Sequence, residues 1–139
     1  MTELTFNTGR RAFNINGVVE VSFNDTDVDF VERLYSVFAK LDEKQDYYKT
    51  RVQTTPDGEI FSLMRDLDSD MREELNGLFE TDVCTPLFGR MNVFALADGL
   101  PLWANLMLCI MEQVDAAYSR EQKAINPRVQ KYTAKWQKK

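Results

Sequence analysis

The chain has 139 residues, of which 44% are hydrophobic and 28% are charged, and its net charge is −5. This length suits one domain with a single core, and the hydrophobic content excludes general disorder. The acidic balance disfavours general binding to nucleic acid, because a phosphate backbone repels an acidic body. We therefore expect a single α+β domain over 1–139, made of a β-meander (1–23), a helical body (26–119) and a basic amphipathic helix (120–139).

Residues 1–23 predict three β-strands. Leu4 and Phe6 alternate with polar neighbours, and a turn signal at residues 7–9 separates them from the next alternating segment. The Asn-Gly pair at 16–17 is a strong hairpin signal, because both residue types tolerate positive φ. The expected structure is a three-stranded antiparallel meander with one apolar face, packed on a bundle of three to four helices. Its open edges favour pairing with another copy of the chain, and hence a homo-oligomer.

Two amphipathic helices follow, because apolar residues recur at spacings of three and four over about 26–52 and again to about residue 80. The loop between them carries Thr55 as a possible N-cap of the second helix and Pro56 as its first residue. A connector with one short helical turn is expected around 83–90, and a third helix is expected to begin at Pro101.

The first half of this third helix is apolar on all sides. Such a helix is expected to be enclosed on all sides, as a central core helix between the sheet and the other helices. The alternative leaves part of it, with Trp103 as anchor and Leu106 beside it, for a partner or a second copy.

The end of the chain is strongly basic. Residues 1–119 hold 10 basic and 21 acidic side chains, whereas 120–139 hold 7 basic and 1 acidic. An Asn-Pro cap at 126–127 and helical spacing predict a short amphipathic helix. Its apolar stripe consists of Ile125, Val129, Tyr132 and Trp136. We expect this stripe to close over the core or to bind a protein partner, and contact with a membrane surface is the weakest of the alternatives.

Residue groupings for catalysis are scarce. The chain has no histidine, no phosphate-cradling Gly-rich loop and no CxxC pair, and Cys84 and Cys109 lie 25 positions apart. Asp66, Asp68 and Asp70 match the opening of a calcium loop, but the required Gly and Glu are missing, so a solvated helix face is expected. We therefore expect no enzyme, no metal, no cofactor, no nucleic-acid partner and no membrane span.

Several segments carry a resemblance to a known family. They are Met91–Asn105, Arg120–Lys123, 126–128, Asn24–Asp27 and Phe30–Leu34. Together they resemble a family of small proteins from phages and prophages of Firmicutes that are similar to tail assembly chaperones. The resemblance extends over nearly the whole chain.

This resemblance implies a non-catalytic role in the cytoplasm of the infected host bacterium. The partner it implies is the tape-measure protein, a long, helix-prone and aggregation-prone protein that a tail assembly chaperone binds during tail morphogenesis. Two alternatives stay open: a structural protein of the virion, and a phage protein that inhibits or triggers a host defence system.

Overall fold

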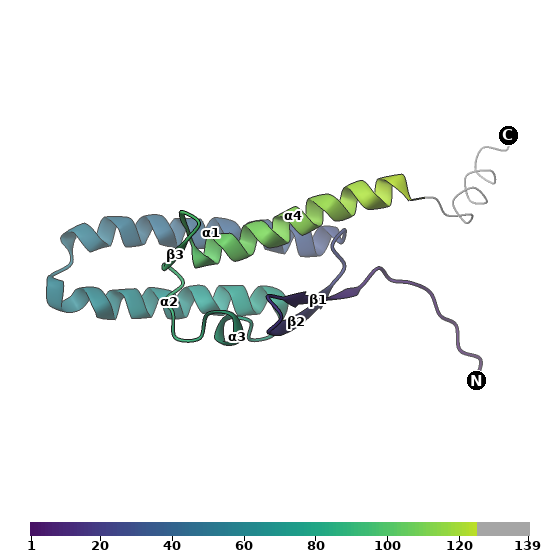
Figure 1. Cartoon of the computed structure of the whole chain (residues 1–139), viewed down its shortest axis with the longest axis horizontal. Helices are drawn as coiled ribbons and strands as arrows, with labels where there is room; N and C mark the ends of the chain where they lie inside the picture. The colour runs from purple at the N-terminus through teal and green to yellow at the C-terminus, as the bar shows by residue number, and fades with distance from the viewer. Residues whose placement is uncertain (125–139) are drawn as a thin grey trace.

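The computed structural model describes residues 1–124 of the chain. Over this range the fold is α+β, with four helices and two small antiparallel sheets of two strands each. In chain order the elements are β1 (Arg11–Ile15), β2 (Val19–Phe23), α1 (Val28–Thr54), α2 (Asp57–Phe79), α3 (Cys84–Phe88), β3 (Leu96–Ala97), β4 (Leu100–Pro101) and α4 (Leu102–Lys123). Helices α1 and α2 form a long hairpin, and α4 lies beside α1 (Figure 1).

The two predicted amphipathic helices are present, and their ends show how the loop between them differs from expectation. Asp27 caps α1 by accepting a hydrogen bond from the backbone of Asp29. Thr55 is not the N-cap of α2: it follows α1, and its hydroxyl donates to the carbonyl of Arg51 at 2.6 Å. Pro56 immediately precedes α2 instead of being its first residue.

The predicted three-stranded meander is wrong, because the N-terminal sheet contains only β1 and β2 within residues 1–124. The predicted hairpin between these two strands is confirmed: Asn16 and Gly17 have φ of 54° and 74°. Residues 1–10 form no strand, and 90% of Leu4 and 78% of Phe6 is exposed.

A contact with Asn24 accounts for this difference. The side-chain amide of Asn24 donates to the carbonyl of Thr8 at 2.8 Å, next to Gly9 with φ +78°. A Cβ at Gly9 would lie 2.4 Å from the Asn24 amide nitrogen, so only glycine allows this close approach. The backbone before β1 is therefore held beside the end of β2, and residues 1–8 extend away from the body (Figure 1).

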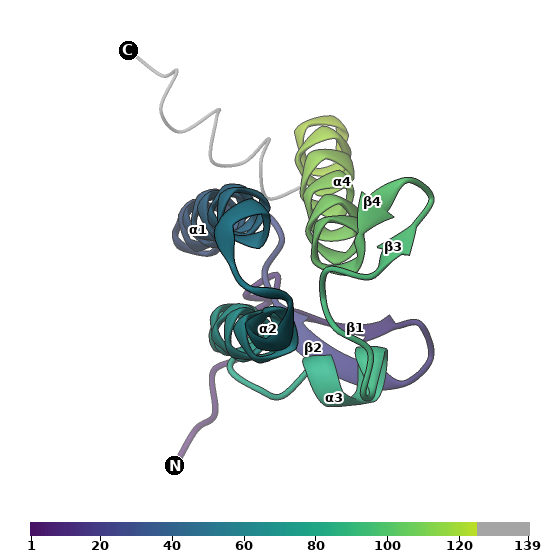
Figure 2. The same ribbon diagram turned by 90° about the vertical axis from the view of Figure 1, so that its left-hand side faces the viewer.

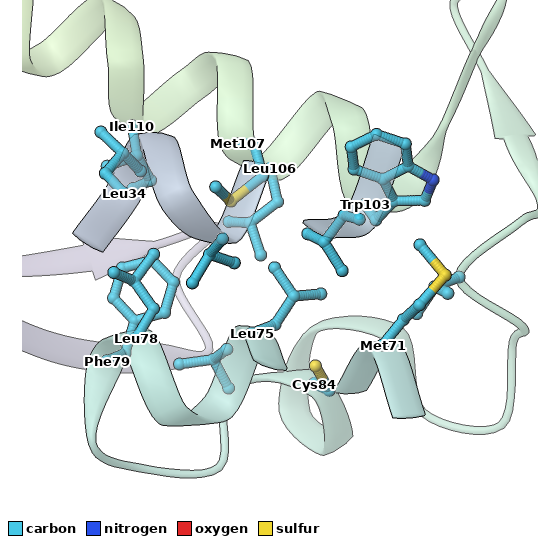
Figure 3. Packing of buried hydrophobic residues seen from close by; sticks show 14 of the residues in the cluster. Leu34, Met71, Leu75, Leu78, Phe79, Cys84, Trp103, Leu106, Met107 and Ile110 are labelled. Atoms are coloured by element: carbon cyan, nitrogen blue, oxygen red, sulfur yellow. The ribbon is translucent and has the colours of Figure 1, made fainter. Parts of the chain in front are cut away.

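One core joins the helices and the sheet, and Figure 3 shows part of it. Leu34, Met71, Leu75 and Met107 are fully buried. The ring of Phe23 stacks between two other rings, at 4.6 Å from Phe13 and 4.2 Å from Phe30. This stack ties the small sheet to α1, which a two-stranded sheet requires because it is only marginally stable alone.

Helix α4 departs from expectation in three ways. It is not enclosed on all sides, because Leu108 and Cys109 are exposed. It continues to Lys123, so the predicted boundary at residue 120 is wrong and Arg120 belongs to its last turn. A hairpin of β3 and β4 precedes α4. It was not predicted, although the Asp-Gly turn at 98–99 is a signal for it. Residues 125–139, with most of the predicted basic helix, lie outside the described residues.

A buried carboxylate joins the start of β1 to α4. Asp25 is only 2% exposed, and its carboxylate accepts hydrogen bonds from Arg11 Nη2 at 2.8 Å and Gln113 Nε2 at 3.0 Å. Arg120 Nη2 lies 3.7 Å from its other oxygen. Burial raises the pKa of Asp25, but the hydrogen bonds from Gln113 and Arg11 and the positive charge of Arg11 outweigh it, so the pKa lies below its ordinary 3.8.

Replacing Asp25→Asn is expected to lower the free energy of unfolding at neutral pH by about 1–3 kcal/mol, because the amide leaves Arg11 without its charged acceptor. Because the pKa of Asp25 is lower in the folded state, its ionised carboxylate stabilises the fold fully at a pH above 3.8. This stabilisation is lost as the pH falls through the lower pKa of the folded state. The difference between variant and wild type, measured by urea unfolding, should therefore shrink below that pH. Asp29→Asn is the control, since that side chain is 77% exposed. A difference independent of pH would contradict the assignment.

Candidate protein-binding groove

An apolar groove lies where α3, α4 and the β3–β4 hairpin approach the turn end of β1. Its volume is about 460 Å³. The apolar residues that line it include Ile15, Leu87, Phe88, Met91, Leu102 and Leu106. Figure 2 shows the β3–β4 hairpin beside α4, with β1 between this hairpin and α3. Asn16, Asp98 and Asn105 supply a polar rim.

The position of α3 depends on two side chains before it. The Asn76 side-chain oxygen accepts from the backbone amides of Val83 at 2.8 Å and Cys84 at 3.1 Å. Asp82 accepts from the backbone amide of Thr85 at 3.1 Å, and its hydrogen bonds to Thr85 lower the pKa of Asp82. These bonds hold a helix of only five residues in place, and its Leu87 and Phe88 line the groove.

An ion pair on α2 holds the wall that carries Met91. Arg72 and Asp68 lie one turn apart, with Arg72 Nε 3.0 Å from Asp68 Oδ2. Arg72 Nη2 also donates to the carbonyl of Met91 at 2.6 Å, and Asp68 accepts from the backbone amide of Val93 at 2.7 Å. The expectation that Asp68 belongs to a solvated face is therefore wrong, since it is half-buried and binds backbone 25 residues away.

The third wall is the short β3–β4 hairpin. The backbone amide of Leu102 donates to the carbonyl of Ala95 at 2.8 Å, and the Asn105 side chain donates to the carbonyl of Ala97 at 2.8 Å. These bonds fasten the hairpin to the first turn of α4. Ala97 of this hairpin lines the groove, and the side chain of the preceding residue, Leu96, is 73% exposed.

The structure separates the residues that the sequence pointed to as partner contacts. Trp103 is 3% exposed and faces α1, where its indole nitrogen donates to Gln45 at 2.8 Å and its ring meets Phe38 edge-on. It is a core residue with no surface for a partner in this fold. Leu106 is 6% exposed and contributes to the groove lining. Ile125, Val129, Tyr132 and Trp136 lie outside the described residues.

The most exposed of the large apolar groove residues was missed at the level of sequence. Met91 lines the groove and is 54% exposed, and Leu96, which is 73% exposed, precedes the lining residue Ala97. Both lie in the segment before the third helix, and the Asp-Gly turn at 98–99 was the signal that a hairpin projects there.

The surroundings of the groove favour a particular kind of ligand. Residues 1–124 carry 12 basic and 22 acidic side chains. Among these residues no group of three or more histidine, cysteine or carboxylate side chains is placed to hold a metal ion. No helix in the same part of the chain is both long and apolar enough to cross a membrane. An apolar groove on an acidic body suits an amphipathic segment whose polar flanks are basic.

Comparisons with models of protein families, with curated proteins and with solved structures give no match for this chain.

The two cysteines are expected to differ sharply in reactivity. Cys109 is exposed at the groove, whereas Cys84 is buried, and desolvation raises the pKa of its thiol to about 12. A thiol-specific reagent at mildly alkaline pH should therefore modify one thiol per folded chain quickly and the second only after unfolding. Cys109→Ser should remove the fast phase, and two equally fast thiols in the folded wild type would contradict the described packing.

Proposed function

We propose that this protein is a non-catalytic phage tail assembly chaperone that binds a helical segment of the tape-measure protein in the cytoplasm of the infected host. The observation that carries the proposal is the apolar groove lined by Leu87, Met91 and Leu106 on an acidic body. The resemblance of the sequence to the family of Firmicutes phage proteins supplies the identity of the partner.

The physical role follows from helix-in-groove recognition. A long helical protein that is still unassembled exposes apolar stripes, which aggregate unless they are covered. The groove covers part of such a stripe, and the surrounding carboxylates attract basic residues that flank it. Each large apolar side chain that is fully buried contributes about 1.5–3 kcal/mol. A few contacts of this kind suffice for reversible binding.

A charge in the groove wall at Met91 and a second charge at Leu96, the residue before the lining residue Ala97, should weaken this activity selectively. We expect the double variant Met91→Lys/Leu96→Lys to reduce the amount of a co-expressed tape-measure fragment that stays soluble, and to weaken its binding about tenfold or more, because lysine removes apolar contact and repels basic flanks. Both side chains are more than half exposed, so the fold should persist. Measurements are the soluble fraction, binding by calorimetry and the circular dichroism spectrum.

The double variant Val28→Lys/Phe61→Lys is the matched control. Val28 is 69% and Phe61 is 70% exposed, and neither lines the groove. This variant removes a comparable apolar surface and adds the same two charges elsewhere, and client binding should be unchanged. Equal losses in the groove variant and the control would show that binding is not at the groove. No effect of the wild-type protein on tape-measure solubility would overturn the chaperone role itself.

The basic end of the chain supplies the second predicted contact. Residues 125–139 carry five basic side chains and no acidic one, and their apolar stripe includes Tyr132 and Trp136. This chemistry suits acidic helical stretches of the same long partner.

Mass spectrometry of purified virions tests the alternative that this protein is a structural protein of the particle. A structural protein should be detected in the virion, whereas an assembly chaperone should be absent from it.

A further inference from the structure

Two turns of similar sequence and backbone conformation contribute to the rim of the apolar groove. Asn16 and Gly17 lie between β1 and β2, and Asp98 and Gly99 lie between β3 and β4. These residues have φ between 54° and 79°, the positive values that Asn-Gly and Asp-Gly pairs favour in hairpin turns. Figure 2 shows both turns on the side of the molecule away from α1. The first residue of each turn, Asn16 or Asp98, lines the groove.

The two rim side chains have nearly the same shape but differ in charge. Asn16 carries a neutral amide, whereas Asp98 carries a carboxylate, which is negative at neutral pH. Of the described residues that line the groove, Asp98 is the only charged one. Its carboxylate forms no ion pair with a basic side chain in the range 1–124. The lining of the groove therefore carries one unpaired negative charge, at the β3–β4 turn.

The hairpin holds the backbone that carries this carboxylate in place. Ala97 pairs with Leu100 across the turn, so that only Asp98 and Gly99 lie between the paired residues. The side chain of Asn105 donates to the carbonyl of Ala97 at 2.8 Å, which ties the residue before Asp98 to α4. A charged group on a fixed backbone loses less conformational freedom on binding than one on a flexible loop. The carboxylate is therefore well placed to contribute to the choice of ligand.

We propose that Asp98 is the specificity-determining residue of the groove, and that it binds a lysine or arginine side chain directly beside the apolar stripe of the bound helix. This inference rests on the proposed function, because it concerns the same groove and the same helical ligand. Leu87, Leu102 and Leu106 of the lining accept any apolar stripe of suitable size. The carboxylate distinguishes among such stripes, because it attracts a basic neighbour and repels an acidic one.

This role differs from the general attraction between an acidic body and a basic ligand. The net charge of the body acts over distances of about 10 Å at moderate salt and attracts any basic segment, wherever its charges lie. A single carboxylate on the groove rim acts only on a charge that the bound helix brings beside it. Asp98 therefore selects the position of the basic residue relative to the apolar stripe, and it places that residue at the β3–β4 turn.

Asp98→Asn tests the charge without changing the turn, because Asn-Gly suits such a hairpin as well as Asp-Gly does. Calorimetry with a soluble tape-measure fragment should show binding about three- to fivefold weaker than that of the wild type, and less dependent on salt. The control Asp115→Asn removes one charge from an exposed position on α4 that does not line the groove, and it should leave binding unchanged. Unchanged binding by Asp98→Asn, or equal losses in both variants, overturns the proposal.

A second variant moves the charge at constant net charge. Asn16→Asp/Asp98→Asn exchanges the side chains of the two turns, and both positions have a positive φ, which asparagine and aspartate adopt more readily than most residues. Both hairpins should therefore form. The binding of the fragment should be as weak as with Asp98→Asn alone. Binding at the wild-type level would show that a carboxylate at either turn suffices, and this result overturns the assignment to Asp98.

A double-mutant cycle identifies the ligand residue that Asp98 binds. Each lysine and arginine of the fragment is replaced by glutamine in turn, and binding is measured to the wild type and to Asp98→Asn. One replacement should weaken binding to the wild type about as much as Asp98→Asn does, and should have little further effect on that variant. Additive losses at every position overturn this inference and leave the chaperone role intact. A wild-type protein that binds no part of the tape-measure protein overturns the proposed function, and this inference with it.

Discussion

The fold depends on one buried carboxylate. Asp25 lies in the connection between the sheet and α1, and it accepts hydrogen bonds from Arg11 at the start of β1 and from Gln113 on α4. Three segments far apart in the sequence therefore meet at one negative charge. Because a charge so deeply buried requires its partners, these bonds hold the sheet against α4, and the groove is lined by residues of both.

The sequence indicated much of the fold correctly wherever a local pattern determined the structure. The periodicity of the two long helices and the Asn-Gly turn at 16–17 act over a few residues, and both are present. The prediction of a third strand is wrong because the conformation of the first residues depends on Asn24, whose side chain donates to the Thr8 carbonyl 16 residues earlier. Alternation at Leu4 and Phe6 is typical of a strand, but it does not reveal that Asn24 binds the backbone at Thr8.

The candidate site was harder to predict, because apolar character alone does not separate a core residue from a contact residue. Trp103 and Leu106 lie on the same helix one turn apart, yet the first is bonded to Gln45 inside the core and the second reaches the groove. Met91 has its place because Arg72 binds its carbonyl and Asp68 binds the backbone amide of Val93, which is long-range pairing that spacing does not reveal. The Asp-Gly turn at 98–99 was the one local sequence signal for the β3–β4 hairpin that forms another wall of the groove.

Asn24 and Asp25 are neighbours in the sequence, but they bind different parts of the molecule. Asn24 holds the backbone at Thr8, and Asp25 holds α4 to the sheet, so any rearrangement at one peptide unit acts on both. One dipeptide therefore links the segment before β1 to the contact between the sheet and α4.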